Sequence, residues 1–280
     1  MRELRGKTAV VTGAASGIGR ALAHRFAAEG MQVVLADIEP GPLEEAAAAL
    51  RDEGATVLAV PTDVSRGDQV QALADRAVER FGRVDVVCNN AGVSVGGPIW
   101  ECTVADWEWV LGVNLWGVIH GVRTFVPILL RQGGEGHVVN TASVAGLTSG
   151  PFMGIYNVTK HGVVTLSETL HKDLRLLGSS IRVSVLCPGF VNTRIADSDR
   201  NRPSPLANPV ERERPEELER MIRAMLASGL PPAQVAAMVV DAIRTERFYV
   251  LTHPDLTRLV RQRMEDILEQ RVPEAAIGIT

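Results

Sequence analysis

The chain has few of the features that mark several common protein classes. Only three cysteines occur among its 280 residues, and Cys88, Cys102 and Cys187 lie far apart, without the spacing of metal ligands. We therefore expect neither a disulfide framework nor a metal site. Acidic and basic residues are interspersed, with a net charge of -4. No basic stripe is available for nucleic acid, so we expect no nucleic-acid partner.

Long apolar segments are also scarce. No apolar run stands out as long enough to span a membrane, and residues 1–5 lack the apolar stretch of a signal peptide. We therefore expect a cytoplasmic protein with no membrane association. Lysine is rare as well: Lys7, Lys160 and Lys172 are the only lysines, against 26 arginines.

What the chain does contain is a regular alternation of short apolar runs and helical patterns. Runs such as Val84–Cys88 are almost continuously apolar, which is typical of strands covered on both faces. Alternating strands and helices require crossover connections, so we predict one α/β domain over residues 1–280, a doubly wound parallel sheet with helices on both faces. The predicted strands are Thr8–Thr12, Gln32–Asp37, Thr56–Pro61, Val84–Asn89, Gly136–Ala142, Ile181–Cys187 and Phe248–Leu251.

Two segments depart from this alternation. Residues 194–220 are rich in proline and charge, and follow the carboxyl end of a predicted strand. They form either a solvated surface insertion or a flap over a substrate cleft, because ligands bind at that edge of such sheets. Residues 254–280 carry apolar positions at helical spacing. They predict a helical tail that packs on its own domain or on a neighbour.

A glycine-rich turn joins the first predicted strand to the first helix. Thr12 is followed by Gly13, Ser16, Gly17, Ile18 and Gly19, and a helical pattern begins at once. Glycines let a backbone approach a pyrophosphate, and a helix N-terminus offers free N–H groups and a positive dipole. The turn therefore predicts a dinucleotide phosphate site.

Asp37 ends the second predicted strand. A carboxylate there can accept both hydroxyls of an adenosine ribose and repels a 2′-phosphate, which favours NAD over NADP. The alternative is a carboxylate that only caps the helix starting near Pro42. Asp63 and Val64, and then Asn90, Ala91 and Gly92, follow the third and fourth strands at the same edge. They can stabilise their loops, contact the cofactor, or do both.

Tyr156 and Lys160 lie one turn apart on one face of a predicted helix, 155–177. An ammonium group roughly 4 Å from a phenol, at an effective dielectric of about 20, favours the phenolate by ~4 kcal/mol. That is enough to bring the pKa of Tyr156 to about 7. We therefore expect Tyr156 to be a general acid/base activated by Lys160.

Two polar residues complete the expected set. Ser143 follows the fifth strand, where its hydroxyl can hold a substrate oxygen or can merely cap the strand end. Asn114 lies in an apolar stretch, where its amide must be paired. It either holds a water that relays protons toward Lys160 or bonds to local backbone.

In these motifs the chain resembles the short-chain dehydrogenase/reductase family over residues 5–252. The resemblance implies a seven-stranded Rossmann sheet and a catalytic set of Asn114, Ser143, Tyr156 and Lys160. It also implies cofactor contacts from Asn90 and from Val191–Thr193, after Pro188-Gly189. By the same resemblance, the helices near residues 106–130 and 155–177 pair between subunits as a homodimer or homotetramer.

The function predicted from these features is NAD-dependent hydride transfer between nicotinamide and a secondary alcohol or ketone. Apolar groups near the expected pocket favour a moderately hydrophobic substrate; they are Gly150–Met153, Val93–Val95, Trp100 and Phe190. A non-catalytic nucleotide-binding or redox-sensing protein and a nucleotide-sugar epimerase are the alternatives. A serine hydrolase fits less well because the sequence has no Gly-x-Ser-x-Gly elbow.

Overall fold

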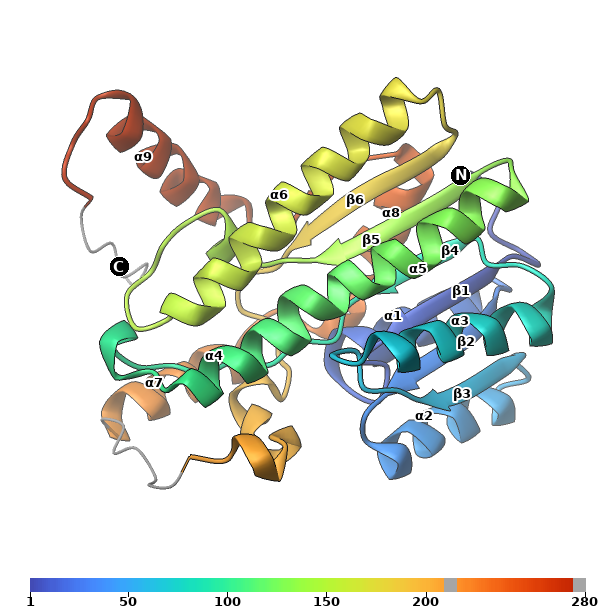
Figure 1. Cartoon of the computed structure of the whole chain (residues 1–280), viewed down its shortest axis with the longest axis horizontal. Coiled ribbons are helices and arrows are strands. Elements are labelled where there is room, and N and C mark those ends of the chain that lie inside the picture. The colour runs from blue at the N-terminus through green and yellow to red at the C-terminus, as the bar shows by residue number, and fades with distance from the viewer. Residues whose placement is uncertain (209–215, 274–280) are drawn as a thin grey trace.

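The computed structural model describes residues 1–208 and 216–273. Seven strands form one sheet in the order β3-β2-β1-β4-β5-β6-β7, and every neighbouring pair is parallel (Figure 1). The order reverses between β1 and β4, which opens a crevice at the carboxyl edge of the sheet. The strands are β1 Thr8–Thr12, β2 Gln32–Asp37, β3 Val57–Pro61, β4 Val86–Asn89, β5 Gly136–Thr141, β6 Ile181–Cys187 and β7 Tyr249–Leu251.

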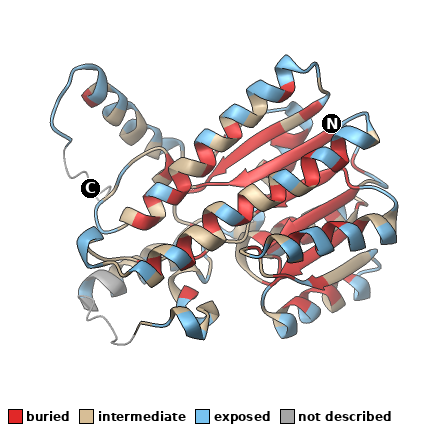
Figure 2. Ribbon diagram, viewed as in Figure 1, coloured by how far each residue is buried: buried red, intermediate tan, exposed pale blue. Residues whose placement is uncertain are grey.

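Helices cover both faces of this sheet, which explains why its strands are so apolar (Figure 2). On one face α1, α2 and α8 bury side chains such as Phe26 and Leu50 against alternate strand residues such as Val11. On the other face α3, α5 and α6 bury side chains such as Phe125 against Val10. The helices are α1 Gly17–Ala28, α2 Pro40–Asp52, α3 Gly67–Phe81, α5 Gly117–Gln132, α6 Gly154–Leu176 and α8 Pro232–Thr245.

The predicted fold class is confirmed, and the predicted strand ends differ by one or two residues. β4 begins at Val86 rather than Val84. At the entrance to this strand, the buried carboxylate of Asp85 accepts the N–H of Thr8 at 2.9 Å and pairs with Arg83. These contacts add to the backbone hydrogen bond from the Asp85 N–H to the Thr8 carbonyl oxygen at 2.8 Å.

The stretch 104–132 corrects one expectation. α4 Val104–Leu111, a π-helical turn Gly112–Trp116 and α5 form one helix, which by length and hydropathy is apolar enough to cross a membrane. The prediction that no such segment exists is wrong. In this fold one side of the helix packs on the sheet through residues such as Val118 and Phe125, as in the core helices of water-soluble domains.

The segment 194–220 and the C-terminal tail are each partly described. Residues 195–201 and 204–206 form short 3-10 helices, η4 and η5, and α7 spans Glu216–Ala227, while 209–215 lie outside the described residues. In the tail, η6 Pro254–Leu256 leads into α9 Thr257–Leu268, which projects from the body (Figure 1). The last residues of the predicted tail, 274–280, also lie outside the described part.

Candidate active site

One cavity at the carboxyl edge of the sheet collects nearly all of the site residues predicted from the sequence. Gly19, Asn114 and Asn192 are the three that do not line it. The predicted residues along its wall are Gly13, Ser16, Gly17, Ile18, Asp37, Asp63, Val64, Asn90, Ala91, Gly92, Ser143, Tyr156, Lys160, Pro188, Gly189, Val191 and Thr193. The cavity thus runs from the end of β2 to the start of α6, across the reversal in strand order.

The glycine turn is shaped by close backbone approaches. Gly13 has φ +67°, and a Cβ on it would stand 2.9 Å from the Cα of Ala91. A Cβ on Gly19 would stand 2.0 Å from the carbonyl oxygen of Gly13, so Gly19 packs the helix against the turn instead of facing the cavity. Ser16 precedes α1 without a side-chain capping hydrogen bond. The first N–H groups of the helix therefore remain available to an anion.

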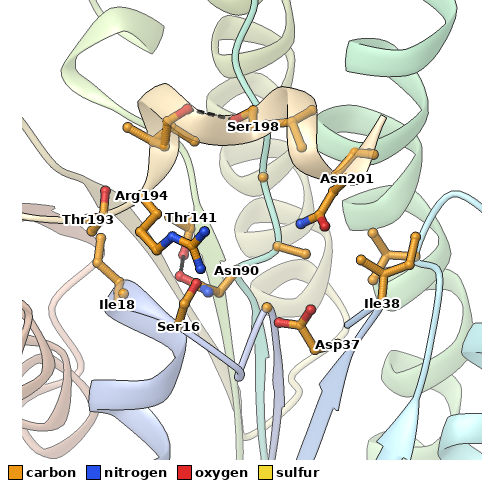
Figure 3. A pocket seen from close by; sticks show the side chains of 18 of the residues that line it. Ser16, Ile18, Asp37, Ile38, Asn90, Thr141, Thr193, Arg194, Ser198 and Asn201 are labelled. Atoms are coloured by element: carbon orange, nitrogen blue, oxygen red, sulfur yellow. Dashed lines mark hydrogen bonds between the residues drawn. The ribbon is translucent and has the colours of Figure 1, made fainter. Parts of the chain in front are cut away.

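Asp37 faces the cavity at the end of β2 (Figure 3). Its two carboxylate oxygens accept the N–H groups of Ala15 at 2.9 Å and of Glu39 at 3.1 Å. Burial raises its pKa, and these backbone hydrogen bonds oppose the rise. Neither of these N–H groups belongs to α2 Pro40–Asp52, so Asp37 does not act as a cap within that helix.

Asn90 is bonded to the ends of β1 and β5, whereas Asp63 is bonded within its own loop. The Asn90 amide donates to the Thr12 carbonyl oxygen at 2.9 Å and accepts from the Thr141 hydroxyl at 3.3 Å. Asp63 accepts the N–H and the hydroxyl of Ser65 at 3.0 and 2.7 Å. Thr12 was not among the predicted site residues, yet its hydroxyl accepts the N–H of both Asn90 and Ala91 and so ties β1 to the β4 loop.

Asn114 is fully buried in the π-helical turn. Its amide oxygen accepts the N–H of Val93 at 2.8 Å, and its amide nitrogen donates to the carbonyl oxygen of Val93 at 2.9 Å. The amide nitrogen also donates to the Thr159 hydroxyl of α6 at 3.3 Å. The partners are therefore the backbone of a distant loop and a side chain of another helix, rather than the local backbone of one alternative. This clamp fixes the loop after β4, where Gly92 lies beside Lys160.

Ser143, Tyr156 and Lys160 meet at the other end of the cavity. The Ser143 hydroxyl is hydrogen-bonded to the Tyr156 phenol, and it also reaches the Pro188 carbonyl oxygen at 3.3 Å. Lys160 is buried, and its Nζ donates to the Thr141 carbonyl oxygen at 2.9 Å. That nitrogen lies 5.4 Å from the centre of the Tyr156 ring.

This geometry corrects the expected pKa of Tyr156. Desolvation by the surrounding protein raises the phenol pKa to about 12, and the Ser143 hydrogen bond only partly opposes it. Burial likewise lowers the pKa of Lys160 to about 8. The expectation of a phenol brought to about 7 by lysine alone is wrong, because the ammonium is directed at a backbone carbonyl and the cost of removing charge from water dominates.

The apolar lining of the cavity differs from the one expected. Of the predicted apolar groups only Val93 lines the cavity, whereas Trp100 is 81% exposed and Phe152 48% exposed. The described wall comes from two places: α4 and the π turn, and the segment after β6. Its members are Trp109, Val113, Ile195, Pro203, Leu206 and Leu226. Trp109 resembled ordinary core in the sequence, and the 195–206 segment has no periodicity from which its contacts could be predicted.

A dinucleotide fits the chemistry of this cavity. The uncapped start of α1 suits two phosphates, and Asp37 offers carboxylate oxygens at the far end, where a ribose would lie. Gly92 has no side chain, and a Cβ there would lie 3.6 Å from Lys160 Nζ and 3.5 Å from the Asn114 amide oxygen. The cavity therefore provides N–H donors for the phosphates, carboxylate acceptors for the ribose and, at Gly92, backbone that no side chain covers.

Comparison with known proteins agrees with this geometry. The family model described as short chain dehydrogenase matches residues 7–204. The chain belongs to the short-chain dehydrogenase/reductase family. A short-chain dehydrogenase/reductase from Burkholderia phymatum, solved in complex with NAD, is similar over 100% of both chains, with 51% identity and a TM-score of 0.97.

Two curated members of the family are also similar. A "CLA biosynthesis dehydrogenase/reductase" of Lactiplantibacillus plantarum is 32% identical over 99% of this chain and 98% of its own length. A "1-deoxy-11-beta-hydroxypentalenate dehydrogenase" of Streptomyces arenae is 38% identical over 93% of this chain and 87% of its own. The names describe oxidoreductases with different substrates, so this short-chain dehydrogenase/reductase shares the reaction class with them.

Proposed function

We propose that this protein uses NAD, in preference to NADP, to interconvert a moderately hydrophobic secondary alcohol and its ketone. The observation that carries the proposal is one continuous cavity with Asp37 at one end and Ser143, Tyr156 and Lys160 at the other. The nicotinamide, when bound, supplies or accepts the hydride. The protein has to hold the substrate oxygen and move a proton to or from it.

Tyr156 is the proton donor or acceptor in this proposal. Its hydroxyl is paired with Ser143, so both hydroxyls can bind one substrate oxygen and stabilise the charge that develops there. Lys160, held by the Thr141 carbonyl oxygen, is a positive charge that favours the deprotonated phenol. Asn114 positions the loop that carries Gly92 beside Lys160.

The preference for NAD rests on Asp37. Its carboxylate would lie against the ribose 2′-hydroxyl and would repel a 2′-phosphate. Two arginines line the cavity: Arg200 is paired with Glu39 at 3.1 Å, and Arg194 lies 4.0 Å from the carboxylate of Asp197. The NAD complex of the Burkholderia relative supports the same cofactor.

The hydrophobic substrate rests on the wall formed by Trp109, Leu206 and Leu226. These side chains offer apolar surface in the cavity that Tyr156 also lines, which favours a carbon skeleton over a sugar. The names of the two curated relatives, one a pentalenate dehydrogenase, support a substrate of this kind.

A spectrophotometric panel tests the proposal. Purified protein is mixed with NADH or NADPH and a series of small, aromatic, alicyclic and long-chain ketones, and absorbance at the nicotinamide band is followed. We expect oxidation of NADH by at least one apolar ketone, with NADPH at least about tenfold poorer. Binding of NADH without turnover by any ketone or alcohol would instead indicate a non-catalytic nucleotide-binding protein.

A further inference from the structure

The segment 194–206 forms the roof of the cavity and joins its two halves. Arg194, Ser198 and Asn201 of this segment lie above the cavity, with Ser16 and Asp37 below them (Figure 3). Farther along, Pro203 and Leu206 belong to the substrate wall. Whatever fixes this segment therefore fixes both the cover of the cofactor and the shape of the substrate pocket.

Besides an ion pair of Asp197 with Arg223 of α7 at 2.6 Å, contacts at three places attach the segment to the rest of the protein. In the middle, the Ser198 hydroxyl accepts the N–H of Ser94 at 3.0 Å. On the substrate side, Arg202 pairs with the buried carboxylate of Asp106 at 2.8 Å. On the cofactor side, Arg200 pairs with Glu39 at 3.1 Å. The third contact is the only one of these made with the loop that also holds Asp37.

Arg200 makes two kinds of contact with one guanidinium group. Its Nε and Nη2 donate to the carboxylate of Glu39 at 3.2 and 3.1 Å. Its Nη1 donates to the carbonyl oxygens of Arg194 at 3.2 Å and Asp197 at 2.9 Å. The planar fork therefore holds η4 together while it binds the β2–α2 loop, a combination that a lysine cannot reproduce.

Glu39 is well placed to receive this contact. Its side chain is only 20% exposed, and the Asn201 amide donates to the same carboxylate at 3.2 Å. Its own N–H donates to the carboxylate of Asp37 at 3.1 Å. One short loop therefore carries both the expected ribose acceptor and the anchor of the roof.

We propose that Glu39 and Arg200 are positioning residues that couple occupation of the adenosine end of the cavity to the ordering of the substrate wall. A ribose bound by Asp37 restrains the loop that presents Glu39, and Glu39 in turn restrains Arg200 and η4. Coupling of this kind is reciprocal in binding free energy, so ordering of the wall also strengthens cofactor binding. The inference rests on the proposed function because it requires that a nucleotide bind beside Asp37.

Hydrogen–deuterium exchange of residues 195–206 tests this coupling without a known substrate. The probes are NADH, ADP-ribose and nicotinamide mononucleotide, each added to the full-length protein. We expect NADH and ADP-ribose to slow amide exchange in this segment by about fivefold or more. Nicotinamide mononucleotide, which lacks the adenosine, should leave the exchange of this segment nearly unchanged.

Three variants isolate the ion pair. Glu39→Ala, Arg200→Ala and the double variant should each lose the protection given by ADP-ribose, and the double variant should be no worse than either single one. Glu44→Ala is the matched control, because Glu44 pairs with Arg51 on α2 and is not a contact of the roof. It should keep the full protection, and melting temperatures show whether every variant is folded.

The outcomes separate this inference from the proposed function. Protection in Glu39→Ala equal to that of the unaltered protein would overturn the coupling while leaving NAD chemistry intact. Equal protection by nicotinamide mononucleotide would overturn it as well. If the unaltered protein did not bind NADH at all, the proposed function itself would fail, and the coupling with it.

Discussion

The phenol of Tyr156 shows how strongly the protein surroundings act on a single residue. Burial raises its pKa to about 12, so the protein by itself favours the protonated form. Protonated tyrosine is ready to donate to a ketone oxygen, whereas alcohol oxidation needs the phenolate. In the proposed reaction, the further lowering must come from the positive charge of the oxidised nicotinamide.

A titration of tyrosinate absorbance tests whether the nicotinamide charge is needed to lower the pKa of Tyr156. The chain has two tyrosines, and the pKa of Tyr249 is also raised to about 12, first by burial and then by its hydrogen bond to Glu168. The free protein should therefore show almost no tyrosinate below about pH 10. In the Tyr249→Phe variant, NAD⁺ should move the remaining ionisation to lower pH. Ionisation near pH 7 without NAD⁺ would mean that Lys160 is sufficient.

At the scale of elements, the contact between α5 and the end of β4 depends on a missing side chain. A Cβ on Gly121 would stand 1.9 Å from the amide oxygen of Asn89, whose amide nitrogen donates to the amide oxygen of Asn140. The helix that carries the π turn can approach the sheet only because of this glycine. Asn114, and through it the loop after β4, is thereby held at the cavity.

Gly121→Ala should destabilise the protein by at least about 2 kcal/mol, because helix and sheet must separate or a buried amide must lose its partner. Denaturant unfolding measures the change. Gly41→Ala is the matched control, since nothing lies within 4 Å of a Cβ at that helical position. The control should be neutral or slightly stabilising. Equal stability of the two variants would contradict this packing.

Much of the arrangement of strands and helices could be predicted from the sequence. Apolar runs and glycine placement were enough to predict a parallel sheet with Asp37, Ser143 and Tyr156 at one edge, because parallel strands end together. The hydrogen-bond partner of Asn114 could not be predicted, since it depends on a π turn that the apolar periodicity of the sequence does not reveal. The predicted pKa of Tyr156 was wrong for a related reason: spacing in the sequence identifies the neighbour of a group but not how far burial removes the group from water.

At the scale of the whole molecule, some of the exposed apolar side chains lie on the helices that cover one face of the sheet. Trp116 is 49% exposed, Leu130 45% and Val158 47%, and they lie on the π turn, α5 and α6. Apolar surface of this kind on a protein of 30.1 kDa is typical of subunit interfaces. We therefore propose that these helices pair between subunits in a homodimer or homotetramer.

Light scattering on the eluting protein should give a mass two or four times 30.1 kDa. Val158→Arg places a charge on this face and should shift the mass downward without loss of helical content. Glu79→Arg, an exposed change on α3, should leave the mass as it was. If the unaltered protein were a monomer, the proposed pairing of these helices between subunits would be wrong.

The proposed chemistry depends most on the pairing of Tyr156 with a substrate oxygen beside a bound dinucleotide. Its most direct test is turnover and NADH affinity measured together in Tyr156→Phe. We predict a loss of turnover of about 100-fold or more, with a dissociation constant for NADH within about twofold of that of the unaltered protein. Substantial turnover in a folded Tyr156→Phe protein would contradict the account.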